Sequence, residues 1–243
     1  MDGSIDSEEP QAPDTPRVVL RHRLSTRLWH WTNAVAVFVM LMSGLMISNA
    51  HPHLYWGKYG ANFDRAWLSL PRFPGWMTIP SYYSLAGARR WHLAFAWVFA
   101  VGLVLFLAVS LLNRHLQRDI APLRKELAPR HIWHDIREHA RLRFPTGEEA
   151  LRYNILQKLS YAGVLLLVLP LLVLTGLAMS PAMGAAWPWL LELFGGRQSA
   201  RSIHFICAAV VGLFIIVHLV MVLLAGPVNE IRSMITGHFR VPE

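Results

Sequence analysis

Four long apolar segments dominate the pattern of hydrophobic and polar positions along the chain. A helix of about 20 apolar residues, rising about 1.5 Å per residue, crosses a bilayer core of about 30 Å. Four segments reach this length, at approximately 29–48, 91–112, 156–179 and 202–224. The first is too long for a secretory signal and follows a mostly polar tail of about 28 residues. The pattern therefore predicts an all-α membrane protein, built as a bundle of four transmembrane helices.

The remaining segments suggest a tail at each terminus, two outer segments and an inner helix. Residues 1–16 are rich in Pro, Ser, Asp and Glu, and we expect a disordered tail over 1–20. Residues 21–235 form the predicted membrane domain, and 236–243 form a C-terminal tail. The outer loop 49–87 holds four prolines and many aromatic residues, which favours a folded loop facing a partner. Residues 185–194 predict a short interfacial helix, and the segment 131–139 predicts an amphipathic helix on the anionic leaflet.

Composition and charge placement support this interpretation and orient it. Hydrophobic residues make up 54% of the chain and charged residues only 16%, whereas soluble domains carry about 25% charged residues. If successive segments alternate in direction, the N-terminal tail, the segment joining the second and third apolar segments, and the C-terminal tail hold four, ten and two Lys and Arg residues on one side. The two loops on the other side hold five and two. Both termini are therefore predicted to be cytoplasmic, and the net charge of +8 is an orientation signal rather than a footprint for nucleic acid.

The cysteine content limits the possible metal chemistry. Cys207 is the single cysteine of the chain. A disulfide framework, a CxxC pair, an all-thiolate cluster and a CxxCH haem attachment are excluded. Metal chemistry must therefore use histidine or carboxylate ligands.

Four of the twelve histidines lie within or at the mouth of an apolar segment: His30, His92, His204 and His218. An ionisable group at membrane depth is costly and marks a functional site by default. A single histidine of this kind more often bonds two helices together. His204 and His218 are 14 residues apart, which places them about 21 Å apart along a helix and on roughly the same face.

The predicted orientation pairs these histidines by depth, His92 with His204 near the outer side and His30 with His218 near the inner side. Two neutral imidazoles on opposed helices suit a six-coordinate b haem. Zinc fits less well, because two histidines leave tetrahedral coordination incomplete and the segments hold no carboxylate to complete it. The sequence thus predicts two bis-histidine b haems stacked across the bilayer.

Several other residues are candidates, each with an ordinary alternative. Cations near the predicted sites are candidates for haem propionates or simple interface anchors: Arg27 at the inner site, and Arg89, Arg90 and Arg201 at the outer site. Glycines within the segments could let the haem rings approach the backbone or could serve helix packing: Gly44, Gly102 and Gly212. Polar residues at the inner ends are quinone candidates or interfacial anchors: Asn33, Gln157 and Lys158. A cluster of His131, His134 and His139 could bind a metal or form a solvated helix face.

The motifs Leu28-Trp29-His30-Trp31 and Arg90-Trp91-His92, together with His204 and His218, resemble the bacterial cytochrome b561 and nickel-hydrogenase b-subunit superfamily over roughly residues 20–235. The outer loop with His51-Pro52-His53 resembles its thiosulfate-reductase-type branch. The resemblance implies a four-helix, di-haem electron conduit in the bacterial inner membrane. It also implies that the four histidines are haem ligands and that ubiquinone or menaquinone exchanges electrons with a redox partner on the outer side.

Three hypotheses of function follow. The first is a cytochrome b subunit that links the quinone pool to a periplasmic enzyme, with a molybdenum-cofactor oxidoreductase as one candidate. The second is a self-contained superoxide:quinone oxidoreductase, whose outer arginines would gather the anion. The third is a haem-free anchor for a partner enzyme. The sequence holds no Ser/His/Asp or paired-carboxylate constellation, so we assign no catalytic side chain.

Overall fold

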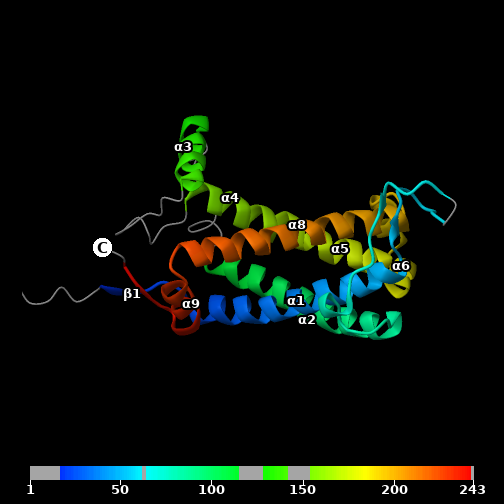
Figure 1. Ribbon diagram of the computed structural model, residues 1–243, viewed down its shortest axis with the longest axis horizontal. Helices are drawn as coiled ribbons and strands as arrows, with labels where there is room; N and C mark the ends of the chain where they lie inside the picture. Colours follow the sequence, from blue (N-terminus) through cyan, green and yellow to red (C-terminus); the bar gives the residue numbers. More distant parts are fainter. Residues whose placement is uncertain (1–16, 62–63, 115–127, 142–153, 242–243) are drawn as a thin grey trace, which may run out of the picture.

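Four long segments run side by side through the computed structural model, which describes residues 17–61, 64–114, 128–141 and 154–241 (Figure 1). They are α1 (Leu24–Ala50), α2 (Leu85–Leu112), the continuous run of α4 (Ile155–Gly163), η4 (Val164–Val168) and α5 (Leu169–Met179), and α8 (Arg197–Leu224). Each is long and apolar enough to cross a membrane. The predicted four-helix membrane bundle is confirmed.

The helices begin earlier than the apolar pattern indicated. α1 begins five residues before position 29 and α8 five residues before position 202. Their first turns are polar, so hydropathy alone does not mark them. α2 begins after Ser84, whose hydroxyl accepts a hydrogen bond from the Gly87 N–H at 3.1 Å. Such a side-chain cap satisfies a backbone donor that the first helical turn leaves free.

The third spanning segment contains a π-helical turn, η4, between two α-helical parts. Pro170 follows two residues later, as the second residue of α5. Proline has no backbone N–H and cannot extend the regular hydrogen-bond ladder, so a wider turn at this point is physically reasonable.

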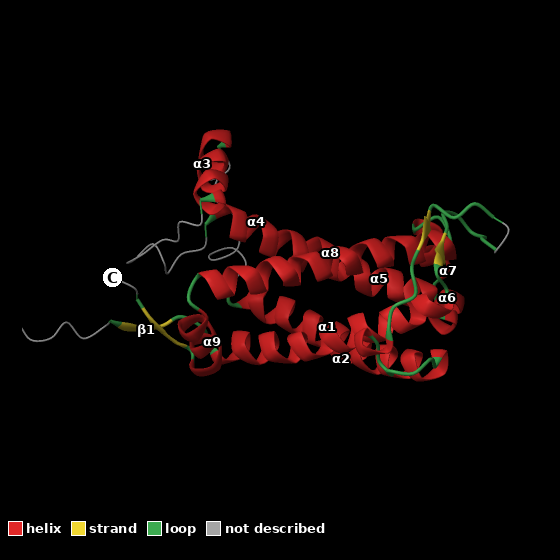
Figure 2. Cartoon of the chain, viewed as in Figure 1, coloured by secondary structure: helices red, strands yellow, loops and turns green. Residues whose placement is uncertain are grey.

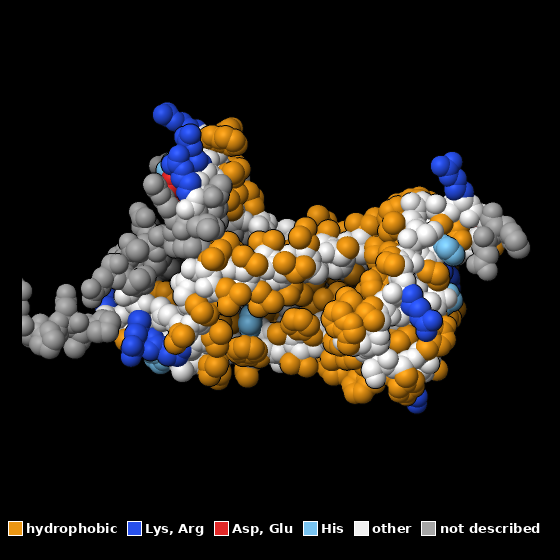
Figure 3. All heavy atoms as spheres, viewed as in Figure 1, with side chains coloured by type: hydrophobic (Ala, Val, Ile, Leu, Met, Phe, Trp, Pro, Cys, Tyr) orange, Lys and Arg blue, Asp and Glu red, His pale blue; other side chains and the backbone are white. Residues whose placement is uncertain are grey.

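The bundle is built from two helical pairs. α1 packs mainly against α2, and α5 against α8. Buried apolar side chains from these helices and η4 form the core: Ala36, Val37, Phe99, Leu103, Leu165, Leu169 and Val211. Hydrophobic side chains also cover the length of the bundle, while Lys and Arg gather toward its two ends (Figure 3). This distribution is that of a protein surrounded by lipid along its middle.

One end of the bundle carries a small cap. β1 (Val18–Leu20) pairs antiparallel with β4 (His238–Arg240), next to α9 (Pro227–Thr236). We call this the inner end, after the predicted orientation. The prediction of a disordered tail over 1–20 is therefore wrong for residues 18–20, which form β1. Residues 238–240 of the expected C-terminal tail form β4. The pairing joins residues more than 200 positions apart, which no local pattern reveals. Residues 1–16 lie outside the described residues.

The predicted amphipathic helix is confirmed as α3 (Pro129–Ala140). It stands across the long direction of the bundle near the inner end (Figure 1). Its basic and hydrophobic side chains lie on opposite sides (Figure 3), with Trp133 and Ile136 exposed. Asp135 joins it to the bundle, because its Oδ2 accepts a hydrogen bond from the Ile155 N–H at 3.3 Å. Contact of α3 with the leaflet stays a prediction.

The opposite, outer end holds the long loop and two short helices (Figure 2). β2 (His53–Leu54) pairs antiparallel with β3 (Leu68–Ser69), and η1 (Gly75–Met77) follows. The prediction of a single interfacial helix over 185–194 is wrong. Two short helices, α6 (Pro181–Ala186) and α7 (Pro188–Leu193), are separated at Trp187. Proline at 188 disfavours a helical conformation for the residue before it, which accounts for the break.

Candidate functional site

The four histidines at membrane depth meet as two pairs. His30 of α1 lies opposite His218 of α8, with ring centroids 6.3 Å apart and ring planes at 60°. His92 of α2 lies opposite His204 of α8, at 6.2 Å and again 60°. The structure thus brings together the same partners that the depth argument pairs. We call them the inner pair and the outer pair.

The spacing within each pair fits one metal ion between two rings. Imidazole nitrogens bind first-row metals at about 2.0 to 2.1 Å, so an ion held end-on by two rings keeps their centroids about 6 Å apart. Among the described residues, no group of three or more His, Cys, Asp or Glu could hold a metal ion. Two ligands are too few for a tetrahedral zinc site, whereas a haem supplies four equatorial nitrogens itself. The residues present therefore fit a b haem.

Hydrogen bonds fix the outer rings. The Nδ1 of His92 lies 3.1 Å from both the Met40 carbonyl oxygen and the Ser43 hydroxyl. A carbonyl oxygen only accepts, so this Nδ1 carries the hydrogen and Nε2 keeps its lone pair. The Nδ1 of His204 lies 3.0 Å from the Thr175 hydroxyl. The outer rings are therefore oriented with the nitrogen that binds metal left available.

Glycines of two neighbouring helices lie against these rings. A Cβ added at Gly44 would lie 3.6 Å from the His92 Cε1, and one at Gly176 would lie 3.6 Å from the His204 Cε1. Of the glycines singled out in the sequence, only Gly44 therefore lies against a histidine. Gly102 instead faces Trp29, whose Cζ3 would be 2.8 Å from an added Cβ, and Gly212 has nothing within 4 Å. Gly102 serves packing.

The two outer positions share a sequence pattern that we did not recognise from the sequence. Residues 43–48 read S-G-L-M-I-S and residues 175–180 read T-G-L-A-M-S. In both, a hydroxyl side chain that contacts a histidine precedes a glycine that packs on the same ring. The contacted histidine is the eighth residue of α2 in one case and of α8 in the other. A search for short internal similarities between the first and third apolar segments would have found Thr175 and Gly176.

The inner pair is held differently. The buried Nδ1 of His30 has no hydrogen-bond partner within the described part of the chain. His30 packs edge-on against Trp31, with centroids 5.1 Å apart and planes at 89°. His218 stacks on Phe214 at 6.0 Å and 9°. The contacts that the described residues make with the inner rings are therefore aromatic, and they include no hydrogen bond to the Nδ1 of His30.

The four candidate arginines lie at both ends of the bundle. Arg27 bonds the Ile235 carbonyl at the inner end, and its buried Nε has no partner among the described residues. Arg201 donates to the His53 carbonyl at 3.4 Å, while Arg89 and Arg90 are exposed. Burial, followed by the nearby charges of Arg201 and Arg89, lowers the pKa of His51. The outer end thus groups two cations around His51, a residue that we had assigned no role.

A second histidine outside the spans, His22 at the inner end, also has a shifted pKa. Burial, followed by the charges of Arg21, His30 and Arg27, lowers the pKa of His22 to about 4. His22 is therefore neutral at physiological pH, and the neighbouring arginines contribute to this.

The three quinone candidates differ in whether their polar side-chain atoms are already used in hydrogen bonds within the described structure. The buried Oδ1 of Asn33 has no hydrogen-bond partner among the described residues. Gln157 is used by the capping box of α4, in which it exchanges hydrogen bonds with Asn154. Lys158 lies in the first turn of α4. Asn33 is the candidate with an acceptor atom to offer.

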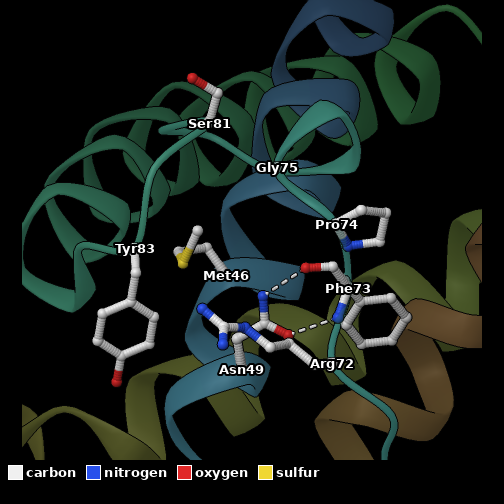
Figure 4. Close-up of a pocket in the computed structure, with 8 residues that line it drawn as sticks. All are labelled: Met46, Asn49, Arg72, Phe73, Pro74, Gly75, Ser81 and Tyr83. Atoms are coloured by element: carbon white, nitrogen blue, oxygen red, sulfur yellow. Dashed lines mark hydrogen bonds between the residues drawn. The ribbon is translucent and has the colours of Figure 1, made fainter.

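A surface pocket of about 210 Å³ lies at the outer end of α1. Asn49 fixes its loop wall through two hydrogen bonds with the Phe73 backbone, at 2.9 Å to the carbonyl and 2.7 Å from the N–H (Figure 4). Arg72 and Tyr83 also line the pocket. None of the four paired histidines lines this pocket.

The model of the family described as prokaryotic cytochrome b561 matches residues 21–237. The chain belongs to this family. It is 29% identical to the "Putative protein-methionine-sulfoxide reductase subunit YedZ1" of Azospira oryzae, over 87% of this chain and 93% of that protein. It is 23% identical to the "Probable Ni/Fe-hydrogenase B-type cytochrome subunit" of Cupriavidus necator, over 87% and 83% respectively. It is 26% identical to the "Putative cytochrome YdhU" of Escherichia coli, over 94% and 77%.

Membership of the cytochrome b561 family confirms the resemblance seen in the sequence. The chain is a multi-pass membrane cytochrome of b type, and its general role is electron transfer in the membrane. Its histidine pairs are the residues in the described structure whose geometry suits the haem that the family implies.

Proposed function

We propose that this cytochrome carries electrons across the bilayer through two bis-histidine b haems. The inner pair, His30 and His218, holds one, and the outer pair, His92 and His204, holds the other. The observation that supports this best is the equal spacing of the pairs, 6.3 and 6.2 Å between centroids. Along α8 the two sites are about 21 Å apart, a separation that supports one site in each half of the bilayer.

Each haem, when bound, supplies reversible one-electron chemistry at its iron. The chain's own residues do the rest. The rings are held from four positions on three helices, and the surrounding apolar side chains keep water away. Arg27 at the inner site, and Arg89, Arg90 and Arg201 at the outer site, are the proposed partners of the haem propionates.

Ubiquinone or menaquinone is the proposed electron carrier at the inner end. A quinone carbonyl needs a hydrogen-bond donor and a quinol hydroxyl needs an acceptor, and the amide of Asn33 offers both kinds of atom. Its buried Oδ1 is without a partner among the described residues. Asn33 also lies one turn beyond His30 on α1, so a headgroup bound there would be near the inner pair.

A periplasmic oxidoreductase is the proposed partner at the outer end, and a molybdenum-cofactor enzyme is the specific candidate. Two relatives are named as subunits of a reductase and of a hydrogenase, which supports a subunit role for this chain. The long outer loop is folded, with a two-stranded sheet and its Asn49 anchor. In this proposal the protein lies in the bacterial inner membrane with both termini in the cytoplasm.

Electron transfer across vesicle membranes tests the proposal. The full chain, loaded with haem, is placed in vesicles that contain ferricyanide, and dithionite is added outside. We expect reduction of the trapped ferricyanide well above the rate in protein-free vesicles, and reduction of the bound haem by added quinol. A His218→Ala protein, which lacks one inner ligand, is the matched control and should lose the transfer. Equal rates with and without protein would overturn the proposal.

The positive cluster at the outer end supports a second candidate, a superoxide:quinone oxidoreductase. Arg89 and Arg201 both lie close enough to His51 to act on its charge, and cations in a recess attract small anions. Two superoxide ions would each give one electron and become dioxygen, while a quinone takes up two electrons and two protons. Stopped-flow mixing of superoxide with the isolated cytochrome separates the candidates: fast haem reduction supports the second, and none rejects it.

A further inference from the structure

We propose that Ser43 and Thr175 lower the reduction potential of the outer haem below that of the inner haem. The inference rests on the proposed function, because it requires one haem at each pair. It follows from a difference between the pairs: both outer rings donate their Nδ1 hydrogen to a protein oxygen, whereas the buried Nδ1 of His30 has no such partner among the described residues.

The physical link runs through the imidazole ring. When Nδ1–H donates to an oxygen, electron density shifts toward Nε2 and the ring becomes a more basic ligand. A more basic ligand stabilises ferric iron over ferrous iron, so the reduction potential falls. At His30, whose Nδ1 has no acceptor among the described residues, this effect is missing, and the inner haem keeps the higher potential.

The two hydroxyls are set to accept and not to donate toward the rings. The Ser43 hydroxyl donates to the Val39 carbonyl at 2.7 Å, and the Thr175 hydroxyl donates to the Leu171 carbonyl one turn earlier in its helix. Both side chains are fully buried, at 0% exposure. Water therefore does not compete for the oxygen lone pairs, and these lone pairs face the ring N–H groups.

Charged groups at the two ends of the bundle have only a weak effect on the difference between the two reduction potentials. Arg89 and Arg201 would raise the potential of the outer haem; water and salt screen the exposed Arg89, whereas Arg201 is partly buried. The inner end carries Arg27 as well, and its Arg21 is paired with Glu230 at 3.3 Å. The hydrogen bonds act on the bonded ligands themselves inside the bundle. We therefore assign the order of potentials to Ser43 and Thr175.

The direction of electron transfer follows from this order. In a molecule with both haems bound and one electron added, the electron would reside mainly on the haem that the inner pair holds. Donation by a partner at the outer end and acceptance by a quinone at the inner end is then the favourable direction.

A potentiometric titration of the full haem-loaded chain, followed by absorbance and electron paramagnetic resonance, tests the inference. Thr175→Val keeps the shape of the side chain and removes the hydroxyl that accepts from His204, while the Leu172 carbonyl remains beside this ring. We expect the lower of the two potentials to rise by at least the equivalent of a tenfold change in equilibrium constant, which is about 59 mV for one electron. Ser43→Ala should likewise raise the lower potential, although the Met40 carbonyl still accepts from His92. The higher potential should not move.

Conservative variants separate tuning from structural damage. Thr175→Ser and Ser43→Thr retain the hydroxyl and should retain the low potential. Ser48→Ala is the matched control, because its hydroxyl donates only to the Gly44 carbonyl, at 3.0 Å, and should change neither potential. An unchanged lower potential in Thr175→Val, or an equal shift of both haems, would overturn the inference. Fewer than two haems in the unaltered protein would instead overturn the proposed function.

Discussion

The outer and inner histidine pairs have the same spacing but different surroundings. In the outer pair, a buried hydroxyl and a glycine from a neighbouring helix contact each ring. In the inner pair, the rings contact Trp31 and Phe214 instead. Helix positions therefore set the distance between rings, while near neighbours set ring orientation and ligand strength. One bundle can hold two chemically similar cofactors and still make them unequal.

Removing one ligand from each pair gives the largest expected effect on this comparison. We expect His204→Ala to lose the outer haem and His218→Ala to lose the inner haem, so that each variant binds one haem per chain. Haem content measured against protein concentration checks the number. Redox titration identifies which haem remains, and the survivor in His218→Ala should be the one with the lower potential. Loss of both haems from a folded chain, or of neither, would refute the pairing.

Enlarging the glycine beside His204 tests the outer contact specifically. Leucine at 176 would push against the ring, and we expect Gly176→Leu to lose more than half of the outer haem while the inner haem is retained. Gly176→Ala is the control, because its Cβ at 3.6 Å makes an ordinary contact. Optical spectra of the two purified variants measure the remaining haem. Full occupancy in Gly176→Leu would show that the ring can move away, against our account.

Acid should weaken the inner end through His22. Its pKa is lowered to about 4 in the folded chain, mainly by burial and then by Arg21, against about 6.5 when unfolded. Between pH 4 and 6.5 the unfolded chain therefore binds more protons at His22 than the folded chain does. The free energy of unfolding has its full value above about pH 6.5 and falls as the pH is lowered toward 4. Thermal unfolding at several pH values should show this decline reduced in His22→Gln. The same slope in both proteins would exclude His22 as the cause.

We expect the smallest effect on stability from breaking the Arg21–Glu230 ion pair at the inner end. Glu230→Gln removes the charge that faces Arg21 across 3.3 Å, between side chains 16% and 23% exposed. Ion pairs near the surface contribute about 0.2 to 1 kcal/mol, so we expect a loss of that size in unfolding free energy at low salt. The loss should shrink at high salt, because ions screen the pair. A salt-independent loss would indicate a packing defect instead.

Much of this structure was predictable because membranes impose simple rules. Length and apolarity identified the spans, and alternation of direction paired His30 with His218 and His92 with His204. The rest depended on contacts that join distant segments. Thr175 donates to its own helix while accepting from His204 29 residues later, and β1 exists only by pairing with β4. Gly102 looked like Gly44 in the sequence, and only the position of Trp29 distinguishes their roles.

The number of b haems bound by the purified full chain, together with their low-temperature resonance spectrum, tests the central claim most directly. If each histidine pair holds one iron, the chain binds two b haems, and both are low-spin with two imidazole ligands. A single haem per chain, or a high-spin signal from a haem with an open position in the intact protein, would contradict the claim.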